Sequence, residues 1–179
     1  MINNSTLIDL KEYILKYNTY FNNSFALLYP IVTEQGYALF NTDGEMAISS
    51  IYDDSLGNYF YIRTNGQPII TSISMADCDK SYRTIHKYTL VAFVDGIKED
   101  VLFNLFHTLN NYLNVTLTNY QDNKSQVIYE ECGQYTNEIM QRIKNCISVL
   151  KIDFEITYNI GEIKNLTNCI KQIKCICCG

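Results

Sequence analysis

Four segments of the chain carry apolar residues at the spacing of an amphipathic helix, namely residues 5–17, 98–113, 135–150 and 162–175. The positions on each apolar face are, in chain order, Leu7, Leu10, Ile14 and Tyr17; Leu102, Leu105, Phe106, Leu109 and Leu113; Ile139, Ile143, Cys146 and Leu150; and Ile163, Leu166, Ile170 and Ile173. The pattern therefore predicts four helices, each with one face turned towards a core.

Short runs of β-branched and aromatic residues, separated by turns that contain glycine, fill most of the remaining chain. The strands predicted before the second helix are residues 25–32, 37–40, 47–52, 59–63, 69–73 and 84–94. Asn65-Gly66 is typical of a tight turn, so we expect the two strands on either side of it to pair as a hairpin. Two further strands, residues 115–120 and 126–131, are predicted to pair with each other.

Residues 151–160 show the clearest strand pattern in the chain. Apolar Ile152, Phe154 and Ile156 alternate with polar residues, a period that indicates one buried and one wet face. The order of elements predicts an α+β fold, with a mostly antiparallel sheet and flanking helices. We expect this domain to span residues 1–161 and a cysteine-rich helical extension to span residues 162–179.

Composition and charge restrict the class of protein. The chain has 179 residues and is 47% apolar but 18% charged, which predicts a folded core. Its 14 basic and 19 acidic residues give a net charge of −5, which disfavours direct binding to nucleic acid. No apolar run approaches the roughly 20 residues of a membrane helix. The N-terminal sequence MINNSTLIDLKEY does not resemble a secretory signal, so we expect neither membrane association nor export.

The seven cysteines are the first candidates for chemistry, because four of them lie in the last eleven residues. Cys169, Cys175, Cys177 and Cys178 have the spacing C-x5-C-x-C-C, without the paired C-x2-C motifs that structural zinc sites usually use. We therefore favour free thiols in a reducing compartment and predict no metal site and no cofactor. A metal-responsive or redox-responsive role for this tail is the alternative.

Catalytic motifs are not evident in the sequence. His86 and His107 are not embedded in a nucleophile motif, and the glycines do not form a phosphate-binding loop. The acidic pairs Asp53-Asp54, Glu99-Asp100 and Glu130-Glu131 are interpreted as a solvated loop, a helix start and a strand end. We therefore predict no catalytic residue. A small cytosolic enzyme with a pocket on the strand block is the alternative.

Tyrosine is abundant, with 15 residues. Tyrosine is favoured where an apolar surface meets water or a partner, and its neighbours here are mainly Asn, Asp and Thr rather than basic residues. Tyr13, Tyr17, Tyr59 and Tyr61 are therefore the candidate residues of a protein–protein interface.

The order of elements over residues 5–160 resembles that of the tail-terminator and head–tail joining proteins of tailed bacteriophages. The similarity covers the helix LIDLKEYILKY, the strand TIHKYTLVAFVDG and the helix KEDVLFNLFHTLNNYL. It continues through the hairpin VTLTNYQDNKSQVIYEEC and a further helix to the final strand VLKIDFEITYNI. The chain is also similar to the neck ring proteins of short-tailed, crAss-like phages. The CICCG end has no counterpart in this pattern.

The resemblance implies a non-enzymatic structural protein of the virion, made in the cytoplasm of the host bacterium. Six or twelve copies would form a ring at the neck, in contact with the portal and with other neck ring and tail proteins. Genome DNA would pass through the lumen without sequence-specific binding, and a net charge of −5 suits a channel that does not hold phosphates. The loop 41–58 and the turn 119–125 are candidates for contacts with neighbouring rings.

Overall fold

The computed structural model describes residues 4–26, 29–33, 36–40, 46–48, 52, 54–75, 79–95, 98–112 and 114–160. The helices are α1 (Asn4–Tyr17), α2 (Lys98–Asn111), α3 (Lys124–Cys132) and α4 (Thr136–Arg142), with single 3-10 turns at Asp54–Leu56 and Gly133–Tyr135. The strands are β1 (Asn23–Ala26), β2 (Tyr29–Thr33), β3 (Gly36–Phe40), β4 (Met46–Ile48), β5 (Tyr59–Thr64), β6 (Ile69–Met75), β7 (Asp79–Asp95), β8 (Val115–Gln121) and β9 (Ile147–Ile160).

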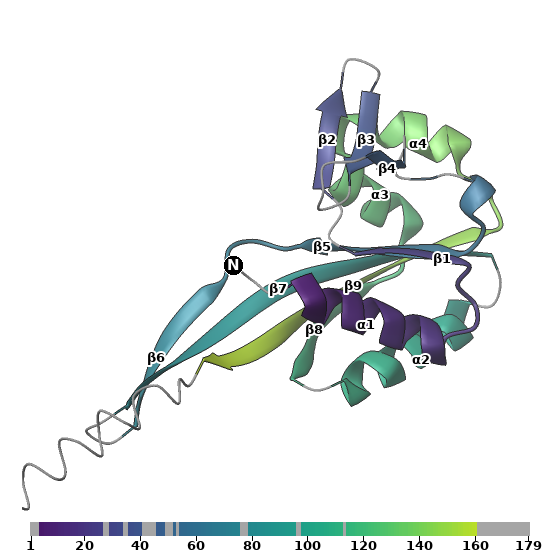
Figure 1. Cartoon of the computed structure of the whole chain (residues 1–179). Coiled ribbons are helices and arrows are strands. Elements are labelled where there is room, and N and C mark those ends of the chain that lie inside the picture. Colours follow the sequence, from purple (N-terminus) through teal and green to yellow (C-terminus); the bar gives the residue numbers. More distant parts are fainter. Residues whose placement is uncertain are drawn as a thin grey trace, which may run out of the picture.

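The main sheet has six strands, in the order β1-β5-β7-β9-β8, with β6 also paired to β7 (Figure 1). Its pairs are antiparallel except β1–β5, which is parallel. β2, β3 and β4 form a second, antiparallel sheet (Figure 1). The predicted α+β class with a mostly antiparallel sheet is therefore confirmed.

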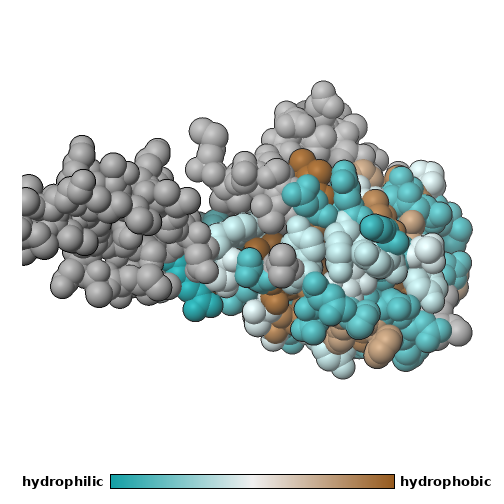
Figure 2. All heavy atoms as spheres, turned by 60° about the horizontal axis from the view of Figure 1, so that its bottom comes forward, coloured by the Kyte–Doolittle hydropathy of each residue, from teal (hydrophilic) through white to brown (hydrophobic). Residues whose placement is uncertain are grey.

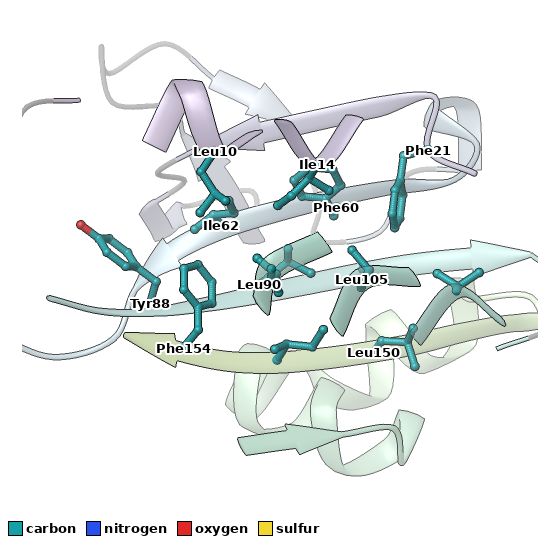
Figure 3. Packing of buried hydrophobic residues seen from close by; sticks show 14 of the residues in the cluster. Leu10, Ile14, Phe21, Phe60, Ile62, Tyr88, Leu90, Leu105, Leu150 and Phe154 are labelled. Carbon is teal, nitrogen blue, oxygen red and sulfur yellow. The ribbon is translucent and has the colours of Figure 1, made fainter. Parts of the chain in front are cut away.

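Helices cover both faces of the main sheet. α1 and α2 pack on one face, where apolar side chains such as Leu10, Phe60 and Leu105 form the larger core cluster (Figure 3). α3 and α4 pack on the other face, where Tyr59 stacks on Phe93 with ring centroids 5.0 Å apart. Because adjacent strand residues point to opposite faces, the central strands must be apolar at consecutive positions.

The predicted strand 126–131 is wrong, because these residues belong to α3. The side-chain oxygen of Asn123 accepts a hydrogen bond from the backbone N–H of Gln126 at 3.1 Å and caps the first turn. Val127, Ile128 and Glu131 then lie on one buried face of the helix, because residues three or four positions apart share a face. This face packs on the sheet. The cap and this spacing outweigh the strand preference of the Val-Ile-Tyr run.

Two other predictions of local structure need correction. The predicted helix 135–150 stops early, since α4 ends at Arg142 and β9 already begins at Ile147. The predicted hairpin across Asn65-Gly66 does not form, because β5 and β6 do not pair with each other. Both pair with β7 instead, β5 along Tyr88–Phe93 and β6 along Asp79–Ile85. A strand of 17 residues is long enough to hold two shorter partners in line.

The strand predicted at residues 25–32 is wrong as one strand, because β1 and β2 divide it between the two sheets, and the strand predicted at 47–52 is described as a strand only to Ile48. The helices predicted at residues 5–17 and 98–113 correspond to α1 and α2. The predicted helix 162–175 and the extension 162–179 lie outside the described residues, so the domain boundary stays a prediction. None of the helices in the described residues has the length and apolar character needed to span a bilayer.

Candidate assembly surface

A three-stranded arm projects from the body of the molecule. It consists of β6, residues 79–85 of β7 and residues 157–160 of β9, and it extends beyond the helices that cover the rest of the sheet (Figure 1). β7 and β9 run without a break from the body into the arm. The arm is therefore a continuation of the main sheet, held by the same ladder of backbone hydrogen bonds.

β6 forms one edge of this arm. It pairs with β7, and no other strand in the described residues pairs with its outer edge. At its start Ile69 and Ile70 are 44% and 66% exposed, which is unusual for isoleucine. An exposed strand edge with apolar side chains is a surface on which another strand can pair. The sequence predicted this strand but gave no reason to expect it on a projecting edge.

β8 forms the opposite edge of the sheet, beyond β9. Tyr120 is 52% exposed there, and its ring meets Phe106 of α2 edge-on, with centroids 5.3 Å apart. The register between β8 and β9 shifts between Leu117 and Asn119, so Thr118 is a bulge. Figure 2 brings the side of α2 and β8 forward and shows small hydrophobic patches among hydrophilic side chains.

A cluster of charged side chains lies where α3 meets the sheet. The carboxylate of Glu131, whose side chain is 2% exposed, accepts hydrogen bonds from Nε and Nη2 of Arg63, both at 2.6 Å. The hydroxyl of Tyr61 donates to the same carboxylate at 3.3 Å, and Nζ of Lys151 lies 3.8 Å from it. Lys151 also pairs with Glu130 at 2.5 Å.

The electrostatics of this cluster favour a structural role. Burial alone would lower the pKa of Arg63, but the hydrogen bonds and the charge of Glu131 outweigh it and raise that pKa. The hydrogen bond from Lys151 holds the pKa of Glu130 below its ordinary value. Two basic and two acidic side chains thus pair with one another in this cluster. The cluster fixes the orientation of α3 on the sheet, because a bidentate Arg–carboxylate pair has a defined geometry.

A polar cleft of about 320 Å³ lies at the other end of the sheet, lined by Asn22, Asp54, Gly57, Asn58, Asp95, Lys144 and Ile147. Lys144 pairs with Asp54 at 2.5 Å across this cleft. The hydrogen bond from Lys144 lowers the pKa of Asp54, and burial raises the pKa of the nearby Tyr52 hydroxyl to about 12. The Asp54–Lys144 pair is about half exposed, and its two opposite charges face each other.

The two histidines lie on different elements, β7 and α2. His86 is buried on β7 among Tyr88 and Tyr158, where burial lowers its pKa, whereas His107 is exposed on α2 and contacts Asn111. Among the residues that the structure describes, no three His, Cys, Asp or Glu side chains are placed to hold a metal ion. The candidate ligands Cys169, Cys175, Cys177 and Cys178 lie outside that part of the chain.

The four candidate interface tyrosines separate into two pairs. Tyr13 and Tyr17 lie on α1 with ring centroids 4.7 Å apart, and Tyr17 is 55% exposed. Tyr59 and Tyr61 are 0% and 1% exposed, inside the cluster under α3 and α4. These two candidate interface residues are therefore not on the surface of this chain. β5 is covered on both faces, so its tyrosines are core residues.

The described parts of the loop 41–58 and of the turn 119–125 contain regular secondary structure. Residues 46–48 form β4, residues 54–56 form a helical turn, and residues 119–121 belong to β8. Residues 41–45, 49–51 and 53 lie outside the described residues.

Comparison with known proteins adds no family assignment. No protein-family model matches the sequence, and no curated protein matches it. The expected resemblance to bacteriophage neck proteins therefore rests on the predicted order of elements, in which the hairpin over residues 115–131 is wrong because α3 replaces its second strand.

Proposed function

We propose that this chain is a non-enzymatic structural subunit that assembles with copies of itself into a ring in the neck of a tailed bacteriophage. The ring would have six or twelve copies, lie between portal and tail, and contact the portal and other neck ring and tail proteins. Genome DNA would pass through its lumen. The alternative is an enzyme or a metal-responsive or redox-responsive protein.

The projecting arm is the observation that carries this proposal. The arm is a three-stranded extension of the sheet, and Ile69 and Ile70 are exposed where its edge strand begins. Exposed strand edges favour association, and natural monomers usually protect them. An arm of this kind is therefore best explained by a partner that covers it.

The charge of the chain agrees with the proposed passage of DNA. A net charge of −5 per copy would place many negative charges around a lumen. A protein that binds DNA tightly neutralises phosphates with Lys and Arg, and a lining that must let DNA slide has no use for such contacts. The acidic excess thus supports passage without binding.

Two measurements test the proposal. Mass photometry of the purified chain is expected to show a species of six or twelve times the 20.7 kDa chain mass. Density-gradient fractionation of the source lysate, followed by mass spectrometry, is expected to find the chain with particles of virion size. A chain that stays monomeric at all concentrations, and remains at the top of the gradient, would refute both the ring and the virion assignment.

The alternative functions predict different results. A metal-responsive protein that uses Cys169, Cys175, Cys177 and Cys178 would carry zinc or iron after purification, which elemental analysis of the full chain would detect. A redox-responsive protein would change its disulfide state between reducing and oxidising buffers, which mass spectrometry after alkylation would show.

A further inference from the structure

We propose that the ring forms by strand pairing, with the outer edge of β6 in one copy joined to the outer edge of β8 in the next copy. This inference rests on the proposed self-assembly and specifies the surfaces that carry it. The main sheet would then continue from one copy to the next, because β6 and β8 lie on opposite sides of the β7–β9 pair in the same sheet.

The two edges match in length and in chemistry. β6 and β8 each have seven residues, and neither contains a charged side chain. The charged residues lie on the inner strands instead, with Arg83 and Lys87 on β7 and Asp153 and Glu155 on β9. This is the reverse of the usual protection of a monomer, in which lysines and other charges are placed on edge strands.

These two strands carry few of the other features that prevent strand pairing at a sheet edge. Pro68 precedes β6, and the bulge at Thr118 leaves three residues of β8 in register on each side. A bulge increases the local twist but leaves the flanking residues able to pair. Ile70, at 66% exposure, and Tyr120, at 52%, add apolar side chains to the two edges.

The equal length of the two edges favours a second copy as the occupant, and charge explains why contact would be made at these strands. Copies that each carry a net charge of −5 repel one another, so the favoured contact surface is one without charge. Both edges meet this condition. Because they are different surfaces, their contact is head-to-tail, and such a contact repeats until the rotation per copy closes a ring.

Two edge-blocked variants of the full chain test this arrangement. Ile70→Lys places a charge on the edge of β6, and Thr118→Lys places one on the edge of β8, both at exposed positions. Asn137→Lys adds the same charge to the exposed side of α4 and serves as the control. Circular dichroism would first establish that all three variants fold.

We expect each edge-blocked variant to be monomeric at concentrations at least tenfold above those at which the wild type and Asn137→Lys assemble. An equimolar mixture of Ile70→Lys and Thr118→Lys is expected to form a dimer and nothing larger. Each partner still has one open edge, so one β6–β8 contact can form and no further copy can be added.

The other outcomes separate failure of this inference from failure of the proposed function. If both single variants assemble like the wild type, or if Thr118→Lys alone forms a dimer through β6, the β6–β8 contact is refuted while self-assembly stands. If the wild type itself does not assemble, both proposals are refuted.

Discussion

The buried pair between Glu131 and Arg63 allows a direct test of how far burial, rather than distance, sets the strength of an ion pair. Glu138 and Arg142 of α4 form a second Glu–Arg pair with the same N–O distance of 2.6 Å. The side chain of Glu131 is 2% exposed, whereas that of Glu138 is 47% exposed. Changing each glutamate to glutamine removes the charge and keeps the shape.

The expected losses in the free energy of unfolding differ severalfold. Glu131→Gln leaves Arg63 and Lys151 as cations without their shared carboxylate, which should cost about 3 kcal/mol, the low end for breaking a buried pair. The low end applies because the Arg63 side chain keeps 21% exposure and can reach water. Glu138→Gln should cost about 0.3–0.5 kcal/mol, as for other exposed pairs four residues apart on a helix.

Urea unfolding followed by circular dichroism at pH 7 measures both losses. A loss of about 3 kcal/mol lowers the midpoint by roughly 1–3 M urea if the slope is typical of a small domain. All variants must be compared at one protein concentration, because assembly shifts apparent stability. The measurement is then repeated in 1 M NaCl, which screens exposed charges over about 3 Å.

Two results would refute this reasoning. One is an equal loss for Glu131→Gln and Glu138→Gln, which would mean that burial of the Glu131 carboxylate adds nothing. The other is a loss for Glu131→Gln that disappears in 1 M NaCl, which would mean that water and salt reach this pair freely.

Three further predictions follow from the structure. Tyr59→Ala should lower the free energy of unfolding by about 3–5 kcal/mol in urea titrations, since this side chain is fully buried. The lowered pKa of Glu130 adds stability that is present above its ordinary pKa of 4.5 and is lost as pH falls through the pKa of the folded state. Lys151→Met removes the main cause of that shift, so the loss of stability below pH 4.5 should become less steep in an acid-unfolding curve. Iodoacetamide should label exposed Cys146 in the native protein, as measured by mass spectrometry. It should label Cys132 only after unfolding, because Cys132 is buried and burial raises the pKa of its thiol to about 12.

The sequence predicted the fold class and most element positions because periodicity reports which residues face a core. The prediction of local structure was wrong where two signals in the sequence favoured different elements. Val127 and Ile128 favour a strand by residue type, but Asn123 caps a helix there. Ile139 and Ile143 fit a long helix, yet the helix ends and Val149 already belongs to β9, a boundary that spacing alone does not mark.

The candidate surface was harder to predict, because it depends on partners distant in the sequence. Nothing in the sequence near Asn65-Gly66 shows that β5 and β6 both pair with β7. Tyr59 and Tyr61 have polar tips and were therefore expected outside, but helices cover both faces of their strand. One usable signal was missed, namely the lack of charge in residues 69–75 and 115–121.

The central position of β7 also determines when the protein can fold during synthesis. β7 pairs with β9 from Tyr82 to Asp95, and residues 96–146 must be made before this pairing begins. A growing chain therefore holds its longest strand with one side open until most of the described chain has left the ribosome. Pairing across such a long loop costs chain entropy before any contact repays it. We expect folding on the millisecond-to-second scale of other proteins dominated by distant contacts, with the joining of β9 to β7 as its late step.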